Sequence, residues 1–418
     1  MIRLHPVPAS VHCCPYCNIK LHVSGWYMPG MRSLAELSCE NCTREFFGDL
    51  GAGQALYTPM LMEKAGGAMH GAPRAPWFAN WLQSSYFKRT DAGLKIDAEE
   101  IRPVKQALLL NCLDAMYGHC LLKLLNAQYC LDQYPEYDLI VLVPKILRWL
   151  VPDGVAAIWS VDLSLSRGAE WNDWLANEIA RRVAQFEKCW LGVAVSHPHP
   201  ESYRIERFTR VLPLSLEQWV SRRPTVTFIW REDRLWSLPA GGGRWTRLRR
   251  LIQRGFISRL EDQQQRMMRF AHALKMQLPD LDLAVAGVAQ PGGLPPWITD
   301  LRRPEMDTAL ERTWCERYAA SHCVVGVHGS NMLLPSAHAG ATVELMPVGH
   351  WGNILQEILF RKEDLRTAVF RHRVLPIDTD PASLATVVSA LITTYPDFAT
   401  YMAPELVSKA VLAARAQT

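Results

Sequence analysis

The stretch CVVGVHGSNMLLP (residues 323–335), with AGATVEL (residues 339–345) shortly after it, decides how this chain folds. The short apolar run at its start predicts a buried strand, and the letters HGS predict a turn at the end of that strand. A helix is expected just after this turn, and the second stretch predicts another buried strand. Apolar strands that alternate with helices are typical of a parallel sheet covered on both faces.

The same alternation occurs in both halves of the chain. The further strands are expected within residues 107–114, 138–144, 155–162, 225–230 and 281–288. The pattern ends before Pro224 and then begins again, so we expect an α/β fold with two successive nucleotide-fold lobes and a cleft between them.

These patterns divide the chain into five expected segments. They are a cysteine module at 1–50, a connector with short helices at 51–105, an N-terminal Rossmann-like lobe at 106–223, a C-terminal Rossmann-like lobe at 224–375, and helices at 376–418 that pack back on the lobes.

The composition is that of a folded globular protein. Of 418 residues, 49% are hydrophobic and 21% charged, and the formal net charge is only +4 without a basic block. This charge argues against indiscriminate nucleic-acid binding, although a basic cleft for a phosphorylated ligand remains compatible with it. No run of ~18 uncharged apolar residues is present, as a membrane span would need. We therefore expect a cytoplasmic protein, with peripheral membrane attachment left open.

Four cysteines near the N-terminus have the spacing of a zinc site. Cys14 and Cys17 form one C-x2-C pair, and Cys39 and Cys42 form another after a 21-residue spacer. Four thiolates in two short turns surround one zinc ion tetrahedrally and leave no open position for catalysis. We expect a zinc ribbon with a structural role or a role in docking a protein partner. The alternative is a set of unligated buried or redox cysteines.

The strand end at His328 has the chemistry of a phosphate site. A small residue at such a turn lets backbone N–H groups approach an anion, and a following helix start favours negative charge. Glu344 is expected on the same rim, where a carboxylate holds ribose hydroxyls. The alternative is an ordinary turn.

The sequence of residues 323–345 also resembles that of the family 61 glycosyltransferases. Their G-x-H-G-(A/S) turn matches residues 326–330, and their P-G-x-x-V-(I/V)-E strand matches residues 339–344, with Ala339 in place of the usual Pro. The run Tyr117-Gly-His119 is similar to the start of the family's first helix, but Lys123 stands where the family has an acid. The resemblance implies a GT-B fold, a nucleotide-sugar donor in the second lobe, an acceptor in the first, inversion, and catalysis without a metal.

Sugar transfer needs a stabilised diphosphate leaving group. Arg231 and Arg234 follow a predicted strand and carry forked donors for two phosphates, unless the run REDR is only a solvated charge cluster. His328 is expected to hydrogen-bond phosphate or sugar, or else to be a packed residue that fixes the loop. Gly329, Ser330 and Asn331 complete the expected donor site, with Ser330 and Asn331 also candidates for helix caps. A second arginine-rich stretch at 241–250 is either another phosphate-binding segment or the exposed start of a helix.

Transfer also needs a base for the acceptor hydroxyl. Asp114 and His119 flank the turn after the first strand of the first lobe and are the candidates. Their structural alternatives are a helix N-cap for Asp114 and a buried first-turn residue for His119.

The sequence thus favours a glycosyltransferase acting on a glycan, lipid-linked or protein acceptor. Two rival hypotheses remain: a non-catalytic zinc-ribbon adaptor with a degenerate nucleotide fold, and a fucosyltransferase-like enzyme that uses a GDP-sugar.

Overall fold

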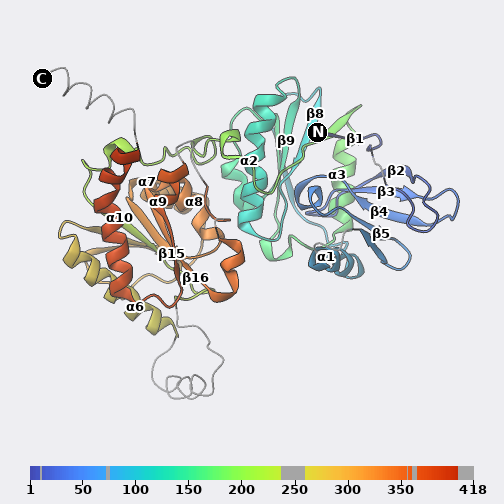
Figure 1. Cartoon of the computed structure of the whole chain (residues 1–418). Coiled ribbons are helices and arrows are strands. Elements are labelled where there is room, and N and C mark those ends of the chain that lie inside the picture. Colours follow the sequence, from blue (N-terminus) through green and yellow to red (C-terminus); the bar gives the residue numbers. More distant parts are fainter. Residues whose placement is uncertain (10–11, 72–75, 237–258, 355, 360–364, 403–418) are drawn as a thin grey trace, which may run out of the picture. The chain divides into compact units, whose positions relative to one another are not determined.

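The computed structural model describes residues 1–9, 12–71, 76–236, 259–354, 356–359 and 365–402 (Figure 1). The chain divides into two compact units, Met1–Phe208 and Thr209–Thr418, and each is described by itself. The predicted loop at 241–250 and the predicted last helix at 404–416 lie outside the described residues.

The second unit contains one six-stranded sheet in which every neighbouring pair is parallel. Its strands are β12 (Thr225–Ile229), β13 (Asp282–Val288), β14 (Ile298–Arg303), β15 (Cys323–Val327), β16 (Ala341–Met346) and β17 (His372–Pro376). They lie in the order β14-β13-β12-β15-β16-β17. Counted within the unit this is 3-2-1-4-5-6, the Rossmann order, so the chain reverses direction across the sheet between β12 and β15.

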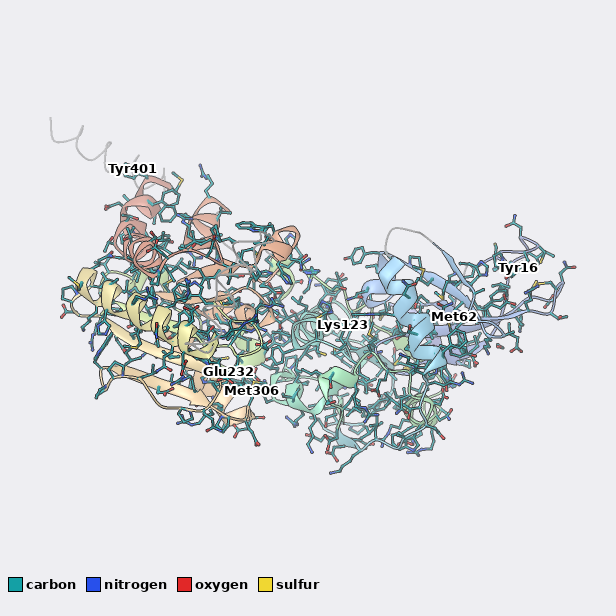
Figure 2. The ribbon with its side chains drawn as sticks, turned by 90° about the horizontal axis from the view of Figure 1, so that it is seen from below. Tyr16, Met62, Lys123, Glu232, Met306 and Tyr401 are labelled. Atoms are coloured by element: carbon teal, nitrogen blue, oxygen red, sulfur yellow. The ribbon has the colours of Figure 1, made fainter. Side chains whose placement is uncertain are left out.

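Among the described residues of the same unit, the α-helices are α6 (Arg259–Gln277), α7 (Thr308–Ala320), α8 (Leu333–His338), α9 (Leu365–Arg371) and α10 (Pro381–Met402). Helix α7 begins at Thr308 because the Asp307 carboxylate accepts a hydrogen bond from the Leu310 N–H at 2.8 Å. Apolar side chains of α6, α10 and the strands pack into one core (Figure 2). Strands β12, β15 and β16 are buried along their whole length, as expected of a parallel sheet covered on both faces.

Residues 209–223, which the sequence places in the first lobe, belong to the second unit. The Trp219 indole N–H donates to the Ile392 carbonyl at 2.8 Å, and its ring lies in the core of this unit. The short helix α4 (Glu206–Thr209) spans the division between the units. A tryptophan anchor of this kind has no periodic signature, which is why the boundary differs from the expected one.

The first unit contains a mixed six-stranded sheet with four parallel strands at its centre. The strands follow the order β1 (Ile2–His5), β11 (Cys189–Leu191), β8 (Ala107–Asn111), β9 (Asp138–Pro144), β10 (Ala157–Val161) and β7 (Ile96–Glu100). Helices α2 (Tyr117–Gln133) and α3 (Asp173–Val183) accompany it. The edge strands β1 and β7 are antiparallel and come from segments expected to be ribbon and connector.

A separate antiparallel sheet holds the cysteine module. Its strands are β2 (His22–Tyr27), β3 (Leu34–Ser38), β4 (Glu45–Asp49), β5 (Met60–Glu63) and β6 (Met69–Gly71), followed by helix α1 (Pro76–Phe87). The sheet thus continues past residue 50 into the expected connector. Met60 and Met62 of β5 explain this continuation, because they are buried against Phe47 and Trp171.

The predicted fold is confirmed in its α/β class, in its two Rossmann-like sheets and in its N-terminal four-cysteine module. Among the helices that the structure describes, none has the length and apolar character to cross a membrane.

Candidate active and metal-binding sites

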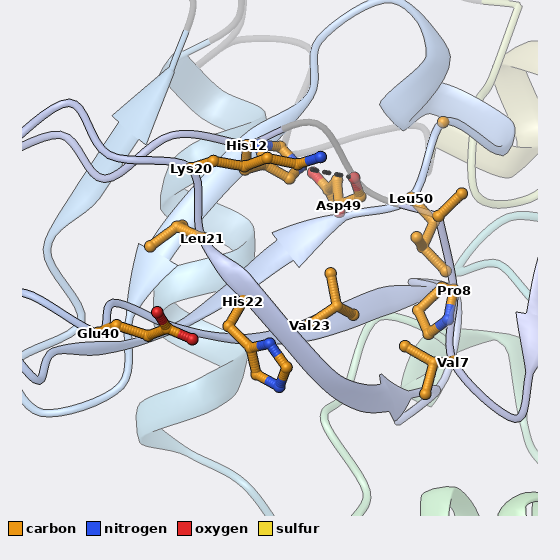
Figure 3. A pocket seen from close by; sticks show the side chains of 12 residues that line it. Val7, Pro8, His12, Lys20, Leu21, His22, Val23, Glu40, Asp49 and Leu50 are labelled. Atoms are coloured by element: carbon orange, nitrogen blue, oxygen red, sulfur yellow. Dashed lines mark hydrogen bonds between the residues drawn. The ribbon is translucent and has the colours of Figure 1, made fainter.

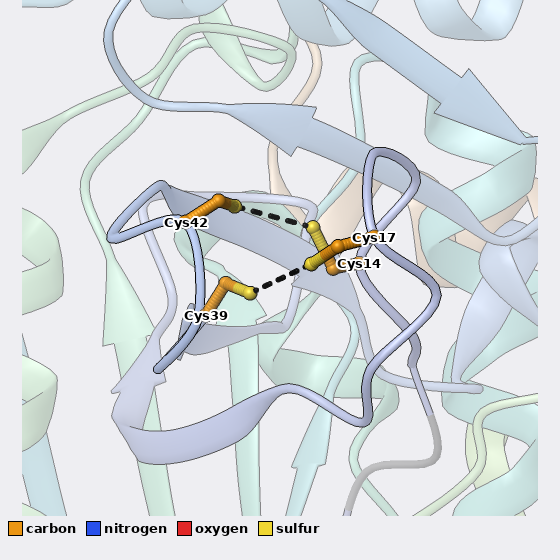
Figure 4. A group of neighbouring side chains, drawn as sticks. All are labelled: Cys14, Cys17, Cys39 and Cys42. Carbon is orange, nitrogen blue, oxygen red and sulfur yellow. Dashed lines mark hydrogen bonds between the residues drawn. The ribbon is translucent and has the colours of Figure 1, made fainter.

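The four predicted zinc ligands converge. The Sγ atoms of Cys14, Cys17, Cys39 and Cys42 all lie within 4.8 Å of one another (Figure 4). Sγ of Cys14 is 3.5 Å from that of Cys42, and Sγ of Cys17 is 3.3 Å from that of Cys39. None of the four is in a disulfide. Four soft donors at this spacing fit one tetrahedral zinc ion.

The two C-x2-C turns have the same backbone construction. In the first, the Asn18 N–H donates to the Cys14 carbonyl at 2.9 Å, and in the second the Thr43 N–H donates to the Cys39 carbonyl at 2.9 Å. Asn18 and Thr43 both adopt left-handed backbone angles, with φ of 56° and 57°. In the second turn, a hydrogen bond from the Cys42 backbone N–H lowers the pKa of Cys39 to about 6, whereas its hydrogen bond with Cys39 raises the pKa of Cys17, so without metal the charge concentrates on Cys39. The paired turns therefore present their sulfurs as a preformed ligand set.

Glu63 on strand β5 forms hydrogen bonds with a residue from each of the two C-x2-C turns. Its carboxylate accepts a hydrogen bond from the Tyr16 hydroxyl at 2.7 Å and one from the Arg44 guanidinium at 2.5 Å. The same guanidinium lies 4.0 Å from the centroid of the Tyr16 ring. These contacts, the Tyr16 hydrogen bond first, lower the pKa of Glu63. Sequence reasoning missed Glu63 because it lies outside the C-x2-C spacing, in the expected connector.

The predicted donor residues of the second unit lie where the chain reverses direction across its sheet. Strands β12 and β15 are parallel neighbours, with Ile229 opposite Gly326. Arg231 follows the end of β12, and His328 follows the end of β15. Ligands of open α/β sheets bind outside the carboxyl ends of the strands at this switch point. The strand order thus brings together two segments that are about a hundred residues apart in sequence.

Two arginine side chains contact the turn at Gly329. Nη1 of Arg234 donates to the His328 carbonyl at 2.5 Å, and Nη1 of Arg231 donates to Oδ1 of Asn331. Gly329 has a φ of +147°, and a Cβ there would lie 2.5 Å from Nη1 of Arg231 and 3.0 Å from Nη1 of Arg234. Only glycine permits both guanidinium groups to approach this turn.

The charge at this turn is only partly compensated. Asp233 pairs with Arg231, whose side chain is 15% exposed. Burial, and next to it the positive charge of Arg231, lower the pKa of Arg234. Two half-buried guanidinium groups that repel each other favour an anion between or beside them. The Arg231 side chain is thus largely buried, whereas its ion-pair partner Asp233, from the same run REDR, is 71% exposed.

His328 and Glu344 form a buried pair at the same turn. Nδ1 of His328 lies 2.6 Å from Oε2 of Glu344, and both side chains are 2% exposed. Oε1 of Glu344 is buried and has no hydrogen-bond partner among the described residues. Glu344, expected to hold ribose hydroxyls, thus has a second role, because it fixes the ring of His328.

The residues after Gly329 differ from their expected capping role. Ser330 begins a 3-10 turn (Ser330–Met332), and the N-caps of this turn and of α8 are Gly329 and Met332, neither with a side-chain cap. Asn331 instead holds Arg231. Helix α8 has six residues, so the anion chemistry of this turn rests on the arginines and not on a helix start.

His350 joins the site and was missed from the sequence. Its ring centroid lies 6.2 Å from that of His328. Burial, followed by the positive charges of Arg234 and His328, lowers the pKa of His350. The signal available in the sequence was its position just after the strand that carries Glu344, on the rim where the other loops end.

The base candidates of the first unit lie at the corresponding point of its own sheet. There the chain reverses direction between β8 and β11, and Asp114 and His119 come shortly after β8. Nδ1 of His119 lies 3.1 Å from Oδ1 of Asp114, and Oδ2 of Asp114 lies 2.8 Å from Nζ of Lys123. The N-cap of α2 is Met116, so the capping role considered for Asp114 is wrong.

The side chains of Gln54 and His197 lie near His119. Nε2 of Gln54 lies 3.3 Å from Nδ1 of His119, and Oε1 of Gln54 is buried without a partner among the described residues. Burial, and next to it the neighbouring His119, lowers the pKa of His197. The His119 side chain itself is 30% exposed, so its other ring nitrogen is available to a ligand.

Described residues of the first unit also line cavities. A cavity of about 720 Å³ borders strand β2 and includes His12, Lys20, His22, Glu40 and Asp49 in its lining (Figure 3). It shares no lining residue with the sites above. A second cavity, of about 10 Å³, is lined by Gln54, Asp114 and Lys123 among others and has room for about one water molecule.

No protein-family model and no curated protein matches this chain. Among solved structures, the chain is similar to the ADP-heptose LPS heptosyltransferase II of E. coli, with 12% sequence identity and a TM-score of 0.37. The match covers 69% of this chain and 99% of that one. A likeness of this degree decides neither fold nor activity, and the family 61 resemblance is not shown by it. The fold rests on the strand orders described above.

Proposed function

We propose that this chain is a glycosyltransferase that moves a sugar from a nucleotide-sugar donor to an acceptor hydroxyl. The observation that carries the proposal is the pair Arg231 and Arg234, held at the Gly329 turn where the second sheet reverses its strand order. Guanidinium groups bind phosphate with paired donors, and a diphosphate has oxygens for both. The second unit would therefore hold the nucleotide diphosphate part of the donor.

The chemistry assigned to these residues is a single displacement. The acceptor oxygen attacks the anomeric carbon, its proton passes to Nε2 of His119, and the bond from that carbon to the diphosphate oxygen breaks. The two arginines stabilise the charge that develops on the leaving diphosphate. One base and one attack imply inversion at the anomeric carbon, and the proposal assigns no catalytic role to a metal.

The four cysteines are proposed to hold a structural zinc ion in the reducing cytoplasm. Zinc supplies folding energy to a small sheet, and all four positions of the ion are filled by sulfur. The exposed turns around the cysteines are the proposed contact for a protein partner. The acceptor is proposed to be a glycan, a lipid-linked glycan or a protein, and no nucleic-acid substrate is expected.

A thermal-shift panel of UDP, GDP, dTDP, ADP and CMP with the zinc-loaded protein tests this function. A nucleotide at about 100 times its Kd stabilises the folded state by about 2.7 kcal/mol. We expect a rise in Tm with one diphosphate that disappears in Arg231→Gln. The exposed Arg312→Gln on α7 is the matched control and should keep the full rise.

The outcome also separates the rival hypotheses. A preference for GDP favours the fucosyltransferase-like enzyme. Nucleotide binding without turnover of any nucleotide-sugar favours the adaptor with a degenerate nucleotide fold. No rise in Tm with any nucleotide contradicts the proposed donor site.

A further inference from the structure

Lys123 is buried beside the proposed base. It lies one helical turn after His119 on α2, so both side chains project from the same face of the helix. Its side chain is 4% exposed, and a lysine this deeply buried needs partners for its charge. Nζ of Lys123 lies 2.8 Å from Oδ2 of Asp114 and donates to the Leu113 carbonyl at 2.8 Å. The residue is labelled in Figure 2.

Asp114 lies between this ammonium group and the imidazole. Oδ1 of Asp114 accepts a hydrogen bond from the Ala115 N–H at 2.8 Å and lies 3.1 Å from Nδ1 of His119. A carboxylate with no other cation next to it pulls a proton onto a neighbouring imidazole, because the resulting ion pair compensates the buried charge. A protonated His119 has no lone pair with which to accept the acceptor proton.

We propose that Lys123 is a positioning residue, which compensates the Asp114 carboxylate so that Asp114 orients His119 without turning the ring into an imidazolium. This inference rests on the proposed function, in which His119 is the base. Asp114 then holds the proton on Nδ1, and Nε2 stays free for the acceptor hydroxyl. The lysine, where the resembled family has an acid, would therefore support the reaction.

The other polar and titratable groups near Asp114 and His119 contribute little to compensating the Asp114 charge, so this compensation depends on Lys123. The Arg32 guanidinium acts on Asp114 only from a distance and has Asp49 as an ion-pair partner at 3.5 Å. Burial raises the pKa of the Cys112 and Cys120 thiols, which therefore stay neutral. Gln54 is uncharged, and its amide must present Oε1, not Nε2, to Nδ1 of His119 when that nitrogen carries the proton. Burial keeps His197 neutral near pH 7, since it lowers the pKa of that ring.

The pH dependence of kcat for Lys123→Met tests the inference. Methionine keeps the length of the side chain and removes its charge. Without the ammonium group, His119 becomes the only cation for Asp114 and binds its proton more tightly. The acid limb of the profile should move to higher pH by roughly one to two units. At a pH below the acid limbs of both the wild type and Lys123→Met, kcat of the variant should be about 10- to 100-fold lower than that of the wild type. The kcat of the variant should recover at high pH, and its KM for the donor should be unchanged. An equal loss at every pH, or an unmoved acid limb, would overturn the role of Lys123.

An NMR titration of the full-length wild-type protein gives a second test that needs no folded variant. Nitrogen-15 shifts of the His119 ring should show a neutral imidazole at pH 7.5 with its proton on Nδ1. A protonated ring at that pH, or a proton on Nε2, contradicts the inference. Failure of every nucleotide to raise the Tm would remove the proposed function, whereas this titration tests separately whether the His119 ring stays neutral beside Asp114 and Lys123.

Discussion

Nδ1 of His328, just after β15, lies 2.6 Å from Oε2 of Glu344 within the neighbouring parallel strand β16, and both side chains are buried. Buried polar groups of this kind are costly when they lose their partner. The pair therefore fixes the ring at the turn that carries Gly329. It links the core of the second sheet to the two arginines of the proposed donor site.

Replacing Glu344 tests this link. Glu344→Leu leaves the buried Nδ1–H of His328 without an acceptor and should lower the free energy of unfolding by about 1–3 kcal/mol. Glu344→Gln keeps an acceptor oxygen and should cost less. Urea unfolding of both variants gives the comparison. Equal stability of the leucine variant and the wild type would show that the pair does not hold the turn.

Replacing Gly329 with alanine tests the approach of the arginines. The new Cβ would contact Nη1 of Arg231, and the φ of +147° disfavours any side chain, so nucleotide binding should be lost. Gly292→Ala is the matched control, since Gly292 has a φ of +123° with open space around it. We expect the control to lose some stability and keep nucleotide binding. Loss of nucleotide binding in both would trace the effect to backbone strain and not to the arginines.

Metal analysis tests the cysteine site. Purified wild-type protein should contain about one equivalent of zinc per chain, and Cys39→Ser should contain less than half an equivalent. Cys13→Ser is the control, because Cys13 is exposed and lies outside the cluster of four sulfurs. Zinc loss in the Cys13 variant, or a zinc-free wild type, would contradict the assignment.

Asp114 gives the stability a defined pH dependence. Burial alone would raise its pKa, but the charge of Lys123 and the hydrogen bond from His119 outweigh burial and lower it. A lowered folded-state pKa contributes stability that is complete above the unfolded value of about 3.9 and is lost as the pH falls through the folded value.

Asp114→Asn should therefore be less stable than wild type by roughly 3–5 kcal/mol at pH 7, the cost of removing one partner of a buried ion pair. The difference in the free energy of unfolding should persist at pH 5 and shrink below about pH 4. Urea titrations at several pH values measure it. A difference that stays constant down to pH 2 would mean that the carboxylate is not ionised in the folded protein.

Much of this fold follows from local sequence signals. The strands around residues 107, 138, 225 and 323 are short, continuous apolar runs, and the turns after them carry Gly or polar residues. The four cysteines of the metal site can be identified from their spacing in the sequence alone. These features are local, so a single sequence contains enough information to place them.

The remaining features depend on partners distant in the chain. Nothing near Glu63 indicates that it binds Tyr16 and Arg44, and nothing near residues 2–5 indicates that they pair with residues 189–191. The roles of Glu344 and Lys123 likewise appear only when strand order and helix phase bring their partners close. Such contacts leave no periodic trace in the sequence.

The most direct test of the proposed donor site is calorimetric binding of a nucleoside and of its diphosphate to the wild type and to the double variant Arg231→Gln/Arg234→Gln. Each charged hydrogen bond contributes about 1.5–3 kcal/mol, so the diphosphate should bind the wild type at least about 100-fold more tightly than the nucleoside. We predict that this ratio falls to within about tenfold in the double variant. The same ratio in both proteins would contradict a diphosphate site at Arg231 and Arg234.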